Sequence, residues 1–221
     1  SWAKMLNRIF VKTYPAPPVD RREALRYAGY KGEPSENALA LFDECLRETE
    51  NAVSCRVCYM ATPVSALPER FFQSALVRRR LCGAEYALVF AATVGLEMDR
   101  LVLRYQELSP AKALLLQALG AERIESLCDM FCAEMSAECA KRGYAAGSRF
   151  SAGYGDLPLA EQSWFFAALD CPRKIGLTLN ESLLMTPTKS VTALVPIGGT
   201  GEKTGENCAD CQKTDCAFRK G

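Results

Sequence analysis

The chain has 221 residues, of which 49% are hydrophobic and 24% charged, which is ordinary for a globular protein with one sizeable core. Its formal net charge of +1 excludes a global field that would draw it to nucleic acid or an anionic membrane, and no stretch of about 18 apolar residues could span a membrane. The absence of histidine excludes Ser-His and Cys-His nucleophilic catalysis and histidine-bearing zinc sites.

The eleven cysteines indicate free thiols, because an odd number does not suit a disulfide framework. The N-terminal stretch up to Pro18 has neither a long apolar segment nor a clear cleavage site, so it does not read as a secretory signal. We therefore expect a cytoplasmic protein with neither a nucleic-acid nor a membrane partner.

Apolar spacing predicts helices and strands that follow one another without a regular βα alternation. Ser35 is placed as a helix N-cap, and Ser109-Pro110 is expected to break or bend the first of two long helical stretches. In chain order the expected elements are helices over 19–34 and 35–51, a strand over 52–64, a helix over 67–83, a strand over 84–95, long helical stretches over 96–120 and 121–143, a loop over 148–158, a helix over 159–170, and over 190–198 either a strand or half of a hairpin with residues 175–179.

From residue 198 onward, glycine, lysine and cysteine replace the aliphatic residues. We therefore expect one α+β domain over residues 1–197, with a mainly antiparallel sheet and several helices. Residues 198–221 are expected to form an irregular cysteine-containing tail.

Most cysteines of the body are expected to be core residues, because free cysteine packs as a small hydrophobe. Cys55 and Cys58 form a C-x-x-C, the spacing of redox pairs and half metal sites. On a strand, however, residues three apart point to opposite faces, which favours a structural role for both. The other cysteines expected in the core are Cys45, Cys82, Cys128, Cys132 and Cys139.

The tail contains Cys208, Cys211 and Cys216, which follow no apolar pattern. Three thiolates this close are soft ligands suited to an iron–sulfur cluster or to zinc. A fourth ligand would come from Cys171 or from the Cys55 and Cys58 pair, or one coordination position would stay open. A flexible tail of free thiols is the alternative.

In the loop "SRFSAGYGDLP", Arg149 precedes the run Ala152-Gly153-Tyr154-Gly155. Glycines let backbone groups approach a ligand closely, and arginine binds a carboxylate or phosphate through two parallel hydrogen bonds. A simple turn would use the same residues, so the loop alone leaves both interpretations open.

This loop and a later run together resemble the activation domain of cobalamin-dependent methionine synthase. That family carries an Arg-x-x-x-Gly-Tyr loop with a proline after it, followed by a Gly-x-x-Leu-x-Glu-Ser-x-x-Met-x-Pro-x-x-Ser-Val run. A weaker similarity, which includes the helix of Glu125, extends the resemblance over most of residues 20–196. The matching residues are Arg149, Gly153, Tyr154 and Pro158, then Gly176, Leu179, Glu181, Ser182, Met185, Pro187, Ser190 and Val191.

The resemblance implies a module that binds S-adenosylmethionine and presents it to cobalamin on a partner, a methionine synthase or another corrinoid-binding methyltransferase. An electron donor protein reduces the inactive Co(II), and the methyl group traps the Co(I). By position, Arg149 would hold the ligand carboxylate and Glu125 would lie near its ammonium group. The backbone from Ala152 to Tyr154 would line the pocket, with the Tyr154 ring facing the corrin. Glu125 reads equally well as a surface charge of its helix.

The chain also departs from the family pattern. Phe150, Ala152 and Gly155 replace prolines around the Gly-Tyr pair, Leu159-Ala160 replaces an acid–histidine pair, and Val195 replaces an aromatic residue. A family glutamate shortly before the arginine has no counterpart. The alternatives are therefore a non-catalytic metal-binding or corrinoid-protein adaptor that kept the fold and lost the pocket, and a zinc-ribbon-like interaction protein.

The family's domain has no cysteines like those of the tail. We hypothesise that the tail carries an iron–sulfur site that relays the electron needed for reactivation, since such clusters reach low potentials. A protein free of iron and sulfide after anaerobic purification and reconstitution would contradict this.

Overall fold

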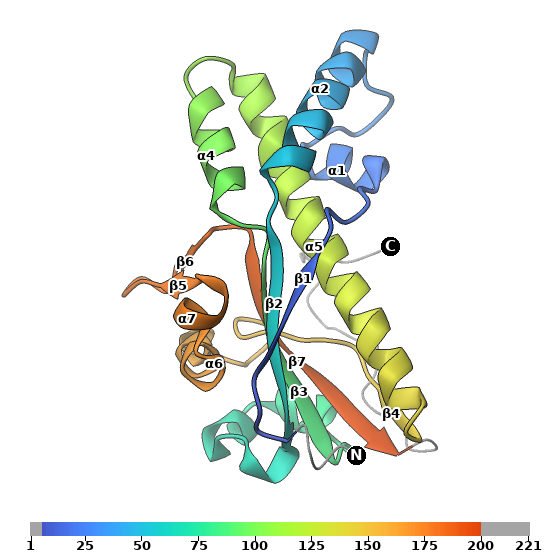
Figure 1. Cartoon of the computed structure of the whole chain (residues 1–221), viewed down its shortest axis with the longest axis vertical. Helices are drawn as coiled ribbons and strands as arrows, with labels where there is room; N and C mark the ends of the chain where they lie inside the picture. The colour runs from blue at the N-terminus through green and yellow to red at the C-terminus, as the bar shows by residue number, and fades with distance from the viewer. Residues whose placement is uncertain (1–5, 200–221) are drawn as a thin grey trace.

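The computed structural model describes residues 6–199, whose strands form a five-stranded antiparallel sheet in the order β1-β2-β3-β7-β4 (Figure 1). A separate ribbon pairs two short strands, β5 and β6. The expected α+β class with a mainly antiparallel sheet is confirmed. The strands are β1 (Phe10–Tyr14), β2 (Cys55–Pro63), β3 (Tyr86–Thr93), β4 (Tyr144–Ala146), β5 (Thr178–Leu179), β6 (Met185–Thr186) and β7 (Ser190–Gly199).

The helices surround this sheet on both faces. In Figure 1, α5 runs along one face for most of the length of the molecule, α6 and α7 lie on the other side, and α1, α2 and α4 gather at one end, which we call the helical end. Short 3₁₀ helices span Val64–Ala66, Glu69–Gln73 and Leu159–Glu161. The α-helices are α1 (Arg21–Tyr27), α2 (Glu36–Ala52), α3 (Ala75–Arg80), α4 (Leu96–Tyr105), α5 (Pro110–Ala140), α6 (Gln162–Leu169) and α7 (Cys171–Ile175).

Both faces of the sheet are buried at its central strands, and successive side chains of a strand enter opposite cores. On β3, Phe90 belongs to the core packed against α5, whereas its neighbour Val89 belongs to the core packed against α6 and α7. Cys55 and Cys58 divide in the same way between the two cores, as their spacing on a strand predicts. This is why the central strands read as continuous apolar runs in the sequence.

The expected break at Ser109-Pro110 is confirmed, since α4 ends before it and Pro110 is the first residue of α5. The expected separation of residues 96–120 from 121–143 is wrong, because α5 continues through Gly120 without interruption. A Cβ at Gly120 would lie 3.1 Å from the Lys189 side chain and 3.3 Å from that of Met98. The glycine therefore serves close packing and does not end the helix.

The other differences are local. The expected helix over 67–83 is divided into a 3₁₀ turn and α3, because Ser74 accepts a hydrogen bond from the amide of Val77 and so begins a new helix. Ser35 caps α2 as expected, at 3.3 Å from the Ala38 amide. Strand β1 was not expected, since its side chains alternate between half-buried and exposed. Cys82 is exposed beyond the end of α3, so its expected place in the core is wrong.

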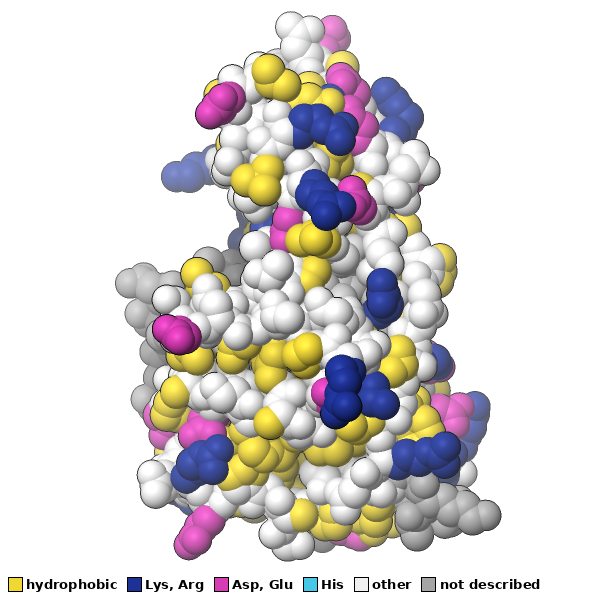
Figure 2. Space-filling view, turned by 60° about the vertical axis from the view of Figure 1, so that its left-hand side comes forward, with side chains coloured by type: hydrophobic (Ala, Val, Ile, Leu, Met, Phe, Trp, Pro, Cys, Tyr) yellow, Lys and Arg dark blue, Asp and Glu magenta, His cyan; other side chains and the backbone are white. Residues whose placement is uncertain are grey.

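Figure 2 brings forward the side of the molecule that carries α4, α6 and α7. Basic and acidic side chains are interspersed on it, and apolar side chains gather in its lower half. Within residues 6–199, no helix has both the length and the apolar character that crossing a membrane requires.

Candidate functional site

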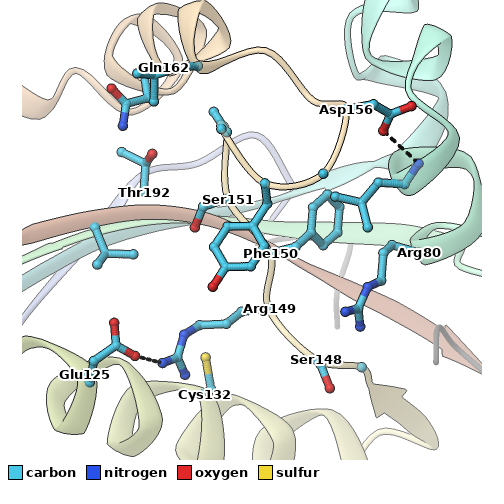
Figure 3. A pocket seen from close by; sticks show the side chains of 18 of the residues that line it. Arg80, Glu125, Cys132, Ser148, Arg149, Phe150, Ser151, Asp156, Gln162 and Thr192 are labelled. Carbon is cyan, nitrogen blue, oxygen red and sulfur yellow. Dashed lines mark hydrogen bonds and ion pairs between the residues drawn. The ribbon is translucent and has the colours of Figure 1, made fainter. Parts of the chain in front are cut away.

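A pocket of about 1170 Å³ lies beside the first half of β7. On this side β4 pairs only with residues 197–199, and Phe150 adds one bridge to Leu194. Residues 190–193 of β7 pair with β3 on one edge, but within the described part of the chain their opposite edge, which faces the pocket, has no strand neighbour. Helices α3, α5 and α6 and the loop over residues 147–156 enclose the space next to it (Figure 3). Its volume suits a small-molecule ligand, which can also reach the backbone groups of this open edge.

The loop is held in place at both of its ends. Phe150 and Leu194 exchange two backbone hydrogen bonds of 2.9 and 2.8 Å, and the Phe150 ring is buried. Gly153 has φ +86°, and a Cβ there would lie 3.1 Å from Leu159 Cδ1. Glycine is therefore needed at this position for both its conformation and its contact.

Asp156 attaches the far end of the loop to α3. Its carboxylate accepts hydrogen bonds from the hydroxyl of Ser74 and from the amides of Ala75 (2.6 Å) and Leu76 (3.1 Å). These bonds, that from Ser74 foremost, lower the pKa of Asp156 to about 2. The loop and α3 are thus one structural unit on this side of the pocket.

On the opposite side, Arg149 faces α5 and contacts two of its carboxylates. Its Nη2 lies 2.7 Å from Glu125 Oε2, and its Nη1 donates to Asp129 (Figure 3 shows the first contact). Burial alone would lower the pKa of Arg149, but Cys128 and these two carboxylates raise it above its ordinary value. We call Glu125, Asp129 and Arg149 the acidic wall, because one cation there meets two anions.

Cys132 follows one turn further along α5 and also lines the pocket. Burial, the largest influence, raises the pKa of its thiol to about 11. The thiol is therefore neutral near pH 7 and is not an activated nucleophile.

Three further pocket residues are almost completely buried and have polar atoms without a partner among the described residues. Arg80 is 6% exposed, Gln162 7% and Thr192 1%. The atoms concerned are Arg80 Nε and Nη1, Gln162 Oε1 and Thr192 Oγ1. In Figure 3, Gln162 and Thr192 lie on one side of the pocket and Arg80 on the other. Sequence reasoning missed all three. A run of three arginines at a helix end gives no sign that Arg80 is the buried one, and no sequence motif marks Gln162 or Thr192.

The residues named from the sequence come together in this pocket. Arg149, Ala152, Gly153 and Tyr154 line it from the loop, and Glu125 lines it from α5. The second motif run contributes Met185, Ser190 and Val191, whereas its Glu181 and Ser182 are exposed and lie outside the lining. The ligand contacts assigned to these residues stay predictions.

The metal site expected in the tail falls on Cys208, Cys211 and Cys216, which lie outside the described residues. The three cysteines considered as a fourth ligand, Cys55, Cys58 and Cys171, are at most 1% exposed, so reaching any of them would require opening the core. Between residues 6 and 199, no group of three or more potential ligand side chains could hold a metal ion. The iron–sulfur or zinc site stays a prediction.

The fold is similar to that of a solved structure described as the crystal structure of the MetH reactivation domain bound to AdoHcy. The TM-score is 0.66 at 15% sequence identity, and the match covers 88% of this chain and 80% of that one. No protein-family model and no curated protein matches the chain. At this identity the similarity shows a shared fold.

Proposed function

We propose that this protein binds S-adenosylmethionine in the pocket beside β7 and acts as a reactivation module for a corrinoid methyltransferase similar to methionine synthase. The observation that carries the proposal is that the loop motif around Arg149 and residues of the second motif run line the same pocket. The AdoHcy named in the description of the similar structure is the demethylated form of the same ligand.

In this proposal the reacting metal belongs to the partner. One electron from a donor protein would convert cob(II)alamin to cob(I)alamin, which would attack the methyl carbon of S-adenosylmethionine. The carbon–sulfur bond would break as the carbon–cobalt bond forms, and S-adenosylhomocysteine would leave with the electron pair of the broken bond. This chain therefore acts by binding and orienting the methyl donor.

The acidic wall suits the positive part of such a ligand. Glu125 and Asp129 outnumber Arg149 by one charge, so a neighbouring ammonium or sulfonium group would complete the balance. The open edge of β7 over residues 190–193 offers backbone donors and acceptors for a nucleoside. Arg149 keeps the two carboxylates of the wall in place.

The test is titration calorimetry of the purified protein with S-adenosylmethionine and S-adenosylhomocysteine. Arg149→Ala should weaken binding of both by at least about tenfold, because Glu125 and Asp129 would lose the guanidinium that holds them in place and would no longer face the ligand in a fixed geometry. Arg100→Ala is the matched control, since Arg100 pairs with Glu97 on the exposed face of α4.

Failure of the wild-type protein to bind either ligand would contradict the proposal and favour the adaptor that kept the fold without the pocket. Equal binding by the wild type and Arg149→Ala would show that Arg149 does not contribute to ligand binding. If binding is confirmed, recovery of methylcobalamin from a partner poised as cob(II)alamin tests the reactivation step.

A further inference from the structure

The buried polar atoms without partners are concentrated around the pocket. Among the described residues, five buried side-chain nitrogen or oxygen atoms have no hydrogen-bond partner. Four of them belong to Arg80, Gln162 and Thr192, which line the pocket, and only Arg123 Nε lies elsewhere. Since an unpaired buried polar atom destabilises the folded state, its retention in a pocket indicates a group that a ligand pairs.

Arg80 is the charged member of this set. It is the last residue of α3, and within the described part of the chain no carboxylate forms an ion pair with it. The carboxylates that line the pocket are engaged elsewhere: Glu125 and Asp129 contact Arg149, and Asp156 accepts from Ser74 and α3. The charge of Arg80 is thus available to an anion that enters the pocket.

Arg149, in contrast, has both terminal nitrogens occupied by protein carboxylates. A ligand carboxylate placed there would displace Glu125 or Asp129, or would meet their like charge. The role that the resemblance implies for Arg149 is therefore less favourable in this chain than the same role for Arg80.

Gln162 defines the complementary requirement on the other side of the pocket. Its unpaired Oε1 can only accept a hydrogen bond, so the ligand group that faces it must be a donor such as a hydroxyl or an amino group. The unpaired Thr192 hydroxyl lies on the same side as Gln162 in Figure 3, opposite Arg80. The two sides of the pocket therefore suit different ligand groups, namely an anion beside Arg80 and a hydrogen-bond donor beside Gln162.

We propose that Arg80 is the anion-binding residue of the pocket, so that the ligand lies with its carboxylate against Arg80 and a donor group against Gln162 and Thr192. The identity of that ligand as an adenosyl amino acid rests on the proposed function. Its carboxylate meets the first requirement, and its ribose hydroxyls or adenine amino group meet the second.

Two ligands that differ in the amino-acid moiety test this assignment by calorimetry. S-adenosylhomocysteine has a carboxylate, and 5′-methylthioadenosine keeps the nucleoside thioether without it. Arg80→Gln should weaken the first by about ten- to hundredfold and change the second by less than about twofold. Arg78→Gln is the matched control, because Arg78 lies on the same helix, donates to the carbonyls of Phe72 and Gln73, and does not line the pocket. No loss for S-adenosylhomocysteine, or an equal loss for both ligands, would overturn the proposal.

A second measurement does not depend on the adenosyl ligand. The Nε–H signals of arginines are recorded by NMR while wild-type protein is titrated with inorganic phosphate and, separately, with S-adenosylhomocysteine. Comparison with Arg80→Lys, which keeps the charge but lacks Nε, assigns the Arg80 signal. A saturable shift with phosphate supports the anion site even if no adenosyl ligand binds, in which case only the proposed function fails. A signal that neither compound shifts overturns the assignment of Arg80.

Discussion

Two arginines are buried, one at the helical end and one in the pocket, and they differ in their hydrogen-bond partners. Arg123 on α5 is 3% exposed, donates through Nη1 to the carbonyl of Pro17, and lies 3.4 Å from Thr49 Oγ1 through Nη2. Arg80 is 6% exposed and has two nitrogens without a partner among the described residues. The first arginine connects α5 to the chain before α1 and to α2, whereas folding alone does not explain the second.

Lys112 extends the comparison at the helical end. Its Nζ lies 2.5 Å from a carboxylate oxygen of both Glu44 and Glu48, and 4.1 Å from the centre of the Tyr105 ring. Lys112 and Arg123 thus bond to other parts of the fold, whereas Arg80 lines the pocket with two nitrogens that have no partner among the described residues. Three comparisons of variants test how polar side chains with and without partners contribute to stability.

The largest effect is expected for Arg123→Met. It removes the bond to Pro17 and leaves a carbonyl unpaired, so the free energy of unfolding should fall by about 2 kcal/mol. Arg80→Met is the matched variant, and its free energy of unfolding should stay the same or rise, because no described partner loses a bond. Urea unfolding of both variants measures the difference. Equal destabilisation would show that Arg80 is a structural residue as well.

Thr192→Val is expected to stabilise the ligand-free protein by about 1 kcal/mol, because it removes a buried hydroxyl without a partner at nearly constant volume. Thr93 on the neighbouring strand is the control. It is also 1% exposed, but its hydroxyl oxygen accepts from the Ser190 hydroxyl (2.8 Å) and the Gly95 amide. Thr93→Val should therefore lower the melting temperature while Thr192→Val raises it, and a shift of the same sign in both would remove the contrast.

The smallest effect concerns pH and the attachment of the loop to α3. The folded pKa of Asp156, about 2, lies below its ordinary value of 3.8. Its carboxylate therefore stabilises the protein fully above the ordinary value, and this contribution is lost as pH falls from about 4 through 2. Unfolding free energies of wild type and Asp156→Asn should differ above pH 5 and converge toward pH 2. A difference that stays constant with pH would show that ionisation of the Asp156 carboxylate does not stabilise the protein.

The sequence predicted the elements whose apolar pattern is strong. The central strands β2, β3 and β7 bury both faces, and α2 has a clear N-cap at Ser35, so their positions could be inferred from local residues alone. The position of strand β1 could not, because two of its five side chains face solvent and the other three are only half-buried. The role of Gly120 within α5 could not be inferred either, because Lys189 and Met98, against which it packs, lie elsewhere in the sequence.

The candidate site also has a part that the sequence predicted and a part that it could not predict. The loop and the second motif run were found through the family resemblance, and they do line one pocket. The sequence could not show that Arg149 already has two carboxylate partners, because hydrogen-bond partners are set by tertiary packing. For the same reason it could not show that buried polar atoms of Arg80, Gln162 and Thr192 have no partner within residues 6–199.

The unbroken course of α5 has a mechanical consequence. This helix, about 46 Å long at 1.5 Å per residue for its 31 residues, carries Lys112 near one end and the two carboxylates of the acidic wall, Glu125 and Asp129, toward its middle. If the helix had ended at Gly120, Glu125 and Asp129 would lie on a separate helix from Lys112. Because the helix is continuous, the two carboxylates that line the pocket and the lysine that pairs with α2 belong to one rigid element.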